Sequence, residues 1–108
     1  MPTHVLLVDD NPVIRDFLRR YLESETGIKV CGEAADGMDG VEKAAELAPD
    51  LVVMDLSMPG MNGLDAARKL KERMPYVPIV LFTSHKSVLR ESEAISAGVS
   101  AVVSKLES

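Results

Sequence analysis

The sequence has little cysteine and no long apolar run, and each absence excludes whole classes of protein. One cysteine in 108 residues, Cys31, excludes an internal disulfide and a zinc site built from several cysteines. Its apolar setting, IKVCGEA, predicts a buried structural thiol. No apolar run approaches the ~18–20 residues that span a bilayer, and MPTHVLL lacks the basic region and cleavage site of a signal peptide. We therefore expect a soluble, cytoplasmic domain without membrane contacts.

The chain also lacks an excess of basic residues, because its net charge is -5 and its pI is about 4.9. This balance argues against direct contact with nucleic acid. Neither GxGxxG nor GxxxxGK[ST] occurs, which disfavours a nucleotide-binding module. Repeats, low-complexity tracts and internal linkers are absent. The length fits one core, since domains typically span about 50–200 residues, so residues 1–108 are expected to form a single domain.

Short apolar runs alternate with helical patterns along the chain. The runs predict five strands, over Val5–Asp9, Ile28–Gly32, Leu51–Met54, Ile79–Phe82 and Ala101–Val103. Helical spacing between them predicts helices from Pro12 to near Gly27, over Gly37–Ala48, over Leu64–Met74 and, marginally, over Lys86–Ala97. Strands that are apolar throughout are buried on both faces, so this alternation predicts a doubly wound α/β fold with a parallel sheet.

The first predicted helix has a clear start and an apolar side. Asn11 is its expected N-cap, and Pro12 suits its first turn. Its apolar residues recur at helical spacing and are expected to form one stripe: Val13, Ile14, Phe17, Leu18, Tyr21 and Leu22.

Polar residues follow four of the five apolar runs. Asp9 and Asp10 close the first run, Asp55 the third and Thr83 the fourth, while Lys105 comes shortly after the fifth. The carboxyl ends of parallel strands share one sheet edge, where open α/β sheets bind their ligands. The topology therefore predicts that three carboxylates, a hydroxyl and an ammonium group converge.

Such a cluster indicates a definite chemistry. Three adjacent carboxylates cannot all stay ionised without a cation or a raised pKa. Oxygen ligands of this kind suit Mg²⁺, which keeps waters for a phosphate. With Lys105 and Thr83, the metal would surround a transferring phosphoryl group, and Asp55 would be free to act as the nucleophile.

The set DD, DLSMPGMNG, TS and a near-terminal lysine, each at a predicted strand end, resembles the CheY-like receiver domain of bacterial two-component response regulators. The resemblance covers essentially the whole chain. It implies a flavodoxin-like sheet of order 2-1-3-4-5, a Mg²⁺ cofactor and a phosphoryl group received from a histidine kinase or phosphotransfer protein. It also implies a downstream output domain or protein, slow self-catalysed hydrolysis and no other enzymatic activity. The local sequence is most similar to receivers that precede helix-turn-helix domains, so transcription regulation is an expected output.

The resemblance assigns a role to each matched residue. Asp55 matches the phosphoacceptor, Asp10 the direct Mg²⁺ ligand and Asp9 the residue that holds the metal through water. Ser57 matches the position whose backbone carbonyl completes the metal shell. Asp55 itself is also expected among the metal ligands.

The remaining matches concern the switch. Thr83 matches the hydroxyl that moves onto the phosphoryl group, and Lys105 matches the lysine that pairs with it. Two positions depart from the pattern: Val102 replaces the usual switch aromatic, and Leu106 replaces the proline after the lysine. A non-proline cis bond costs about 2.5–4 kcal/mol, so we expect a trans or strained bond before Leu106.

The chain stops at Ser108, before the last helix of the family. We therefore expect residues 1–108 to be the N-terminal part of a longer regulator, or the exposed apolar face to pair in a homodimer. The marginal Lys86–Ala97 helix is the element expected to repack on phosphorylation and to engage a partner.

Other interpretations stay open at the level of the sequence. Asp9 and Asp10 could merely favour the start of the helix, and Thr83 could be an ordinary strand-end residue. A Mg²⁺-dependent phosphatase with an aspartate nucleophile is disfavoured, because such enzymes typically need a second acid where this chain has Ser57. A receiver-like scaffold with altered or lost phospho-switching is kept open by Val102 and Leu106.

Overall fold

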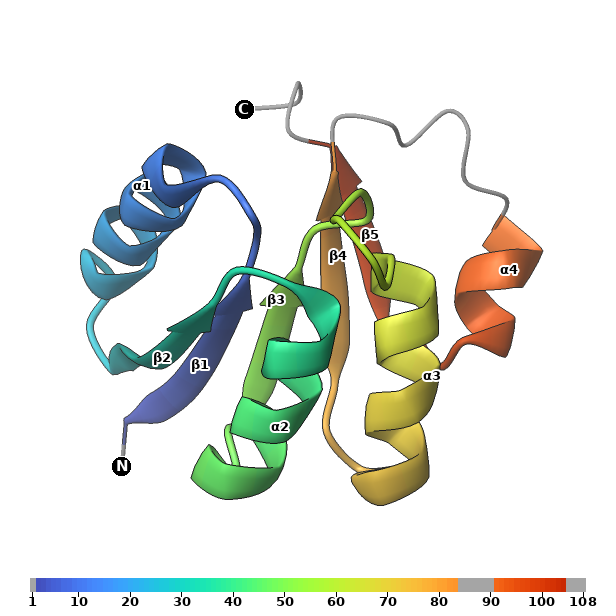
Figure 1. The fold of residues 1–108 in the computed structure, drawn as a ribbon. Coiled ribbons are helices and arrows are strands. Elements are labelled where there is room, and N and C mark those ends of the chain that lie inside the picture. The colour runs from blue at the N-terminus through green and yellow to red at the C-terminus, as the bar shows by residue number, and fades with distance from the viewer. Residues whose placement is uncertain (1, 84–90, 105–108) are drawn as a thin grey trace.

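A computed structural model describes residues 2–83 and 91–104 of the chain. In this part, strands and helices alternate in the predicted order (Figure 1). The strands are β1 (Thr3–Val8), β2 (Ile28–Ala34), β3 (Leu51–Met54), β4 (Ile79–Thr83) and β5 (Ala101–Ser104). The helices are α1 (Pro12–Glu23), α2 (Gly37–Leu47), α3 (Gly63–Arg73) and α4 (Glu91–Ser96). Among the described helices, none has the length and apolar character needed to cross a membrane.

The strands form one parallel sheet of order β2-β1-β3-β4-β5, which confirms the predicted fold class and strand order. All arrows in Figure 1 therefore point the same way, and the C-terminal ends of β1, β3 and β4 lie at the same edge of the sheet. The chain moves from β1 outward to β2 and then crosses to β3 on the other side of β1. The order of the strands reverses at this point, and open α/β sheets place their ligand crevices there.

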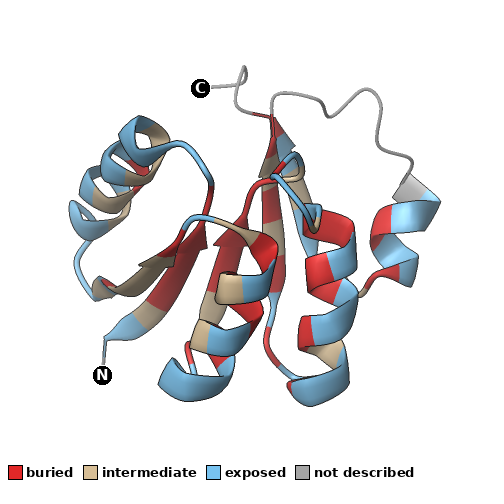
Figure 2. Cartoon of the chain, viewed as in Figure 1, coloured by how far each residue is buried: buried red, intermediate tan, exposed pale blue. Residues whose placement is uncertain are grey.

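Helices cover both faces of the sheet because successive side chains of a strand point to opposite faces. Val5 and Leu7 of β1 share a buried cluster with Leu18 of α1. Leu6 and Val8 instead belong to the larger cluster with apolar residues of α2 and α3, the helices in front of the sheet in Figure 1. All four β1 residues are at most 1% exposed, which confirms that this strand is buried on both faces (Figure 2).

Helix α1 begins as predicted, because the Asn11 side chain accepts hydrogen bonds from the N–H groups of Val13 and Ile14. Its apolar residues, however, do not form a single core stripe. The inner ones pack against the sheet: Ile14, Leu18 and Leu22. The outer ones are largely exposed to solvent: Val13 (73%), Phe17 (59%) and Tyr21 (62%). Helix α1 packs mainly on β1 and β2, at one side of the sheet, so only the inner part of its apolar stripe is buried.

The exposure of Cys31 and the bounds of two elements differ from the expectations. Cys31 is of intermediate exposure, so the prediction of a buried thiol was wrong. It lies on β2, an outer strand of the sheet. The marginal helix predicted over Lys86–Ala97 is helical over Glu91–Ser96, and its earlier part lies outside the described residues. The β2 strand also runs two residues beyond its predicted end, to Ala34.

Candidate functional site: an acidic pocket at the sheet edge

The parallel ladder continues one residue past β1 and β3, and this places two carboxylates. The N–H of Asp55 donates to the carbonyl of Val8 at 2.8 Å, and the N–H of Asp9 donates to the carbonyl of Ala34 at 3.0 Å. Asp9 and Asp55 are only 2% and 7% exposed. Each is therefore fixed by the backbone hydrogen bonds of a central strand at the edge where the strands end.

Asp9, Asp10 and Asp55 form the acidic cluster. Each offers a carboxylate oxygen, and these oxygens lie within 4.8 Å of one another. Asp10 is exposed, whereas its two companions are buried, so the cluster has one open side. Asp9 also accepts a hydrogen bond from the N–H of Asn11 at 2.9 Å, which holds its carboxylate in place. The structure thus brings together three residues that the sequence separates by up to 46 positions (55 − 9).

An open cavity of about 530 Å³ lies on this side of the sheet edge. Asp10 and Ser57, two of the expected metal-site residues, line it. Asn62 and Glu93 line it as well, although no sequence motif marks either of them as a site residue. The cavity gives a ligand access to the acidic cluster from solvent.

The β3–α3 loop is held tightly against Asp55. A Cβ added at Gly63 would lie 2.3 Å from the carbonyl oxygen of Asp55 and 2.9 Å from the Cα of Leu56. The N–H of Gly63 also donates to the Leu56 carbonyl at 2.8 Å. Asn62 caps α3 by accepting from the N–H of Asp65. The NG pair in SMPGMNG therefore starts a helix directly against the backbone of Asp55.

Thr83 ends β4 on the other side of β3, and its side chain is fully buried. It is paired in register with Ser104 of β5, and Lys105 follows Ser104 outside the described residues. Val102, at the position expected for a switch aromatic, lies opposite Leu81 and packs partly buried against the core on the α2 and α3 side. A valine in this setting has no ring to move between an inward and an outward position.

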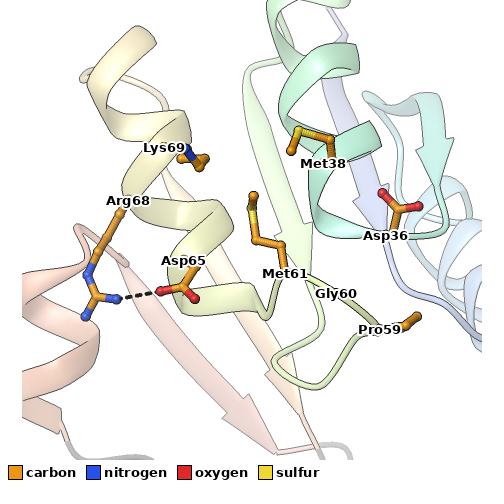
Figure 3. A pocket seen from close by; sticks show the side chains of 8 residues that line it. All are labelled: Asp36, Met38, Pro59, Gly60, Met61, Asp65, Arg68 and Lys69. Carbon is orange, nitrogen blue, oxygen red and sulfur yellow. Dashed lines mark hydrogen bonds and ion pairs between the residues drawn. The ribbon is translucent and has the colours of Figure 1, made fainter.

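A second hollow, of about 760 Å³, lies between α2 and α3 (Figure 3). Met38 of α2 and Met61 of the β3–α3 loop project into it. Arg68 forms an ion pair with Asp65 at an N–O distance of 3.0 Å, and this pair points away from the two methionines. Pro59 lines both this hollow and the acidic cavity. The β3–α3 loop is thus the wall between them.

The donor set of the acidic cluster fits Mg²⁺. Magnesium prefers hard oxygen ligands, usually one or two carboxylates, and keeps several waters. Two buried carboxylates and one exposed carboxylate beside an open cavity provide such oxygens and leave room for water and phosphate. A cation would also offset the mutual repulsion of three acidic groups.

Comparisons with known proteins agree with this geometry. Residues 5–108 match the family model described as the response regulator receiver domain. The chain is 38% identical to the response regulator protein VraR of Staphylococcus saprophyticus over 108 residues, which are 100% of this chain and 52% of that protein. It is 42% identical to the response regulator UvrY of Escherichia coli K12 over 102 residues, 94% of this chain and 47% of UvrY. The chain therefore spans about half the length of these curated relatives.

Solved structures give the same result. A LuxR-family two-component response regulator from Aurantimonas sp. SI85-9A1 is 36% identical and superposes with a TM-score of 0.91, covering 97% of this chain and 75% of that one. The response regulator domain of Thermotoga maritima CheB is 31% identical with a TM-score of 0.90, covering 99% and 81%. Together with the sheet order and the acidic cluster, these matches identify the chain as a member of the response regulator receiver domain family of two-component signalling.

Proposed function

We propose that Asp55 accepts a phosphoryl group from the phosphohistidine of a histidine kinase or phosphotransfer protein. The observation that carries this proposal is the acidic cluster, in which the nearly buried Asp55 carboxylate lies within 4.8 Å of the Asp9 and Asp10 oxygens beside an open cavity. In the transfer, an Asp55 oxygen forms the new bond to phosphorus as the bond between phosphorus and the histidine nitrogen breaks. The leaving imidazole nitrogen keeps the electron pair.

In this proposal Mg²⁺ is held by the carboxylates of Asp9, Asp10 and Asp55 and by the backbone carbonyl of Ser57. Asp10, which is exposed at the open side of the cluster, would be the direct ligand, and Asp9 would hold the ion through water. The bound ion would supply positive charge that neutralises the phosphoryl oxygens. Asp55 is kept in position by its backbone hydrogen bond to Val8, so its carboxylate needs little reorganisation before the reaction.

We propose that Thr83 and Lys105 read the phosphorylated state. The Thr83 hydroxyl at the end of β4 is on the strand next to Asp55, and Lys105 follows the end of β5. A phosphoryl group adds about -1.5 to -2 charges, which both groups would be drawn to bind. Because Val102 cannot supply an aromatic switch, the signal would pass through repacking of α4. This short helix keeps Ala94 buried but leaves Ile95 67% exposed, and Ala97, just after the helix, is buried.

Repacking of α4 is testable by amide exchange. The phosphoryl mimic BeF₃⁻, added with Mg²⁺, should change the protection of the α4 amides while leaving those of α2 unchanged. Equal protection of α4 with and without the mimic would count against this switch route. It would favour the alternative that the domain works as an interaction scaffold with altered switching.

The domain is proposed to act in the cytoplasm as the N-terminal part of a longer regulator, without contacting nucleic acid or membrane itself. Its chemistry would be limited to accepting the phosphoryl group and hydrolysing it slowly. The outer residues of α1 are exposed, and we expect them to pair in a homodimer.

The central experiment is phosphorylation with Mg²⁺ and acetyl phosphate, followed by intact mass measurement. The wild-type chain should gain the mass of one phosphoryl group, and Asp55→Asn should gain none. Asp50→Asn is the matched control, because Asp50 is an exposed aspartate that pairs with His4 near the opposite end of β3. No added phosphoryl group on the wild type, or equal addition to Asp55→Asn, would overturn the proposal.

A further inference from the structure

Arg15 of α1 joins the end of β1 to the end of β2. Its Nη1 donates to the backbone carbonyl of Asp9 at 2.6 Å, and its Nε donates to Oε1 of Glu33 at 3.1 Å. The side chains of Arg15 and Glu33 are 19% and 28% exposed, so solvent screens this ion pair less than one on the open surface. The planar guanidinium can hold both acceptors at once because its donors point in fixed directions.

Glu33 is itself held by two further cations. Its second carboxylate oxygen accepts from Nε of Arg19 at 2.8 Å, and Lys43 of α2 donates to its backbone carbonyl. Glu33 thus keeps Arg15 in one orientation, and the partners of Glu33 come from both faces of the sheet. Hydrogen bonds from residues behind a site in this way fix the orientation of the side chains that they contact.

The Arg15 contact completes the anchoring of Asp9. The N–H of Asp9 donates to Ala34, its Oδ1 accepts from Asn11, and its carbonyl accepts from Arg15. The carbonyl belongs to the peptide unit that joins Asp9 to Asp10. Fixing the plane of that unit restricts the backbone of Asp10 and therefore the direction in which its side chain leaves the chain.

Asp10 depends on this backbone restraint. Its side chain makes no hydrogen bond or ion pair with another residue in the ranges 2–83 and 91–104. It is exposed at the open side of the acidic cluster, and its oxygens approach those of two like-charged neighbours. Repulsion would turn it toward solvent unless the backbone held its Cα–Cβ direction.

We propose that Arg15, fixed by Glu33, is a positioning residue of the acidic site: through the Asp9 carbonyl it holds the Asp9–Asp10 peptide so that Asp10 faces the cation. The inference rests on the proposed function of the acidic cluster as a Mg²⁺ site. Arg15 touches neither the cation nor the phosphoryl group. It acts through the backbone of the two aspartates.

The test compares Mg²⁺ affinity by titration calorimetry in the wild type, Arg15→Ala, Arg15→Lys and Glu33→Gln. Arg15→Ala should weaken Mg²⁺ binding about tenfold, the lower end of the usual effect for groups that orient metal ligands. Arg15→Lys and Glu33→Gln should lose less, because one of the two contacts survives in each. The matched control is Arg20→Ala, which breaks the exposed pair with Asp16 on the same helix and should leave the affinity unchanged.

A readout without metal separates positioning from general stability. In the metal-free chain, Arg15→Ala should lower the exchange protection of the Asn11 amide, which donates to Asp9, more than that of the α3 amides. Equal loss in both places, or a lowered melting temperature with unchanged Mg²⁺ affinity, would overturn the inference. If Arg15→Ala does not fold, unchanged affinity in both Arg15→Lys and Glu33→Gln would overturn it.

The outcomes also distinguish this inference from the proposed function. A wild type that binds Mg²⁺ and is phosphorylated, with variants of equal affinity, defeats the role of Arg15 alone. A wild type that binds no Mg²⁺ defeats the proposed function, and the role of Arg15 with it.

Discussion

The N–H of Asp55 donates to the carbonyl of Val8, the residue directly before Asp9, at 2.8 Å. One backbone hydrogen bond therefore ties the proposed phosphoacceptor to the start of the acidic pair. It continues the regular β1–β3 register, in which Val8 lies opposite Met54. The acids are thus placed by the sheet itself, and the precision of the site follows from the stability of its two central strands.

Gly63 limits how far the β3–α3 loop can move from Asp55. In Gly63→Ala, the new Cβ would meet the Asp55 carbonyl oxygen at 2.3 Å, and backbone atoms cannot turn aside as a flexible side chain can. We expect a loss of about 1–3 kcal/mol in the free energy of unfolding, the usual cost of overpacking. We also expect slower phosphorylation, because Asp55 must shift. Urea denaturation and the rate of mass gain with acetyl phosphate measure the two effects.

The control for this variant is Gly27→Ala. Gly27 has a φ of +89° with open space around its missing Cβ, and it lies away from the acidic cluster. The strained backbone should cost about 1–2 kcal/mol, with no change in the phosphorylation rate. If Gly63→Ala has the stability and the phosphorylation rate of the wild type, the β3–α3 loop can move away from Asp55 more easily than its packing indicates.

The local patterns in the sequence predicted most of this site because a parallel sheet converts strand ends into neighbours. The positions of Asp9, Asp10 and Asp55 at strand ends were enough to predict that they meet at one edge of the sheet. Arg15 and Glu33 could not be found in this way, because they are 18 residues apart and meet only when α1 lies across β2. In the sequence, Arg15 looks like any polar residue on the exposed face of a helix, and Glu33 looks like any polar residue of a strand.

The division of the α1 stripe was also beyond the sequence. Phe17 and Leu18 are equally apolar in the helical pattern, yet Leu18 is 7% exposed and Phe17 is 59% exposed. Helical periodicity fixes which residues share a side of the helix. How much of that side is buried depends on the strands beneath it, and α1 lies mainly over β1 and β2.

The outer stripe of α1 predicts self-association of the 108-residue chain. Val13, Phe17 and Tyr21 lie one turn apart, and the rings of Phe17 and Tyr21 stack with centroids 6.2 Å apart. Removing the ring in Phe17→Ser should weaken association by about tenfold or more, because a buried phenylalanine contributes about 1.5–3 kcal/mol. Sedimentation velocity over a range of concentrations measures the change.

Tyr76→Ser is the matched control for Phe17→Ser. Tyr76 is 79% exposed in the connection between α3 and β4, away from α1. Its removal should leave association unchanged. A wild-type chain that stays monomeric at every concentration would remove the basis for a dimer through α1.

Cys31 should react slowly despite its partial exposure. Burial raises the pKa of the Cys31 thiol, with a smaller contribution from the negative charge of Asp50, so less of the nucleophilic thiolate is present at a given pH. Alkylation by iodoacetamide at pH 8 should be slower in the folded chain than in the same chain unfolded in urea. Equal rates in the two states would contradict this expectation.

The same shift of the Cys31 pKa has a consequence for stability. The unfolded thiol releases its proton at a lower pH than the folded one, so the folded state binds more protons in between. The contribution of this group is fully present below the pKa of the unfolded thiol and is lost as the pH rises through that of the folded thiol. Cys31→Ser should therefore lose less stability than the wild type over that alkaline interval in urea denaturation.

Asp10→Asn should make the metal-free chain more stable while weakening its response to Mg²⁺. The three carboxylate oxygens lie within 4.8 Å of one another, and two charges at about this distance repel by about 1 kcal/mol in a water-like dielectric. Removing the exposed charge relieves that repulsion, so the free energy of unfolding without metal should rise by about 1 kcal/mol. Repulsion among the three carboxylates would then destabilise the metal-free chain, and a bound cation would offset it. Mg²⁺ should accordingly stabilise the wild type more than the variant, since a ligand stabilises the state that binds it.

Asp16→Asn tests whether any loss of negative charge near α1 has the same effect. Asp16 is exposed and pairs with Arg20 on the helix, so its removal should not raise the stability of the metal-free chain. Urea denaturation with EDTA and with saturating Mg²⁺ gives both quantities for each variant. If Asp10→Asn and Asp16→Asn change stability equally without metal, the effect belongs to the net charge of -5 and not to the acidic cluster. A gain confined to Asp10→Asn, paired with a weaker Mg²⁺ response, locates the repulsion at the site where the cation is proposed to bind.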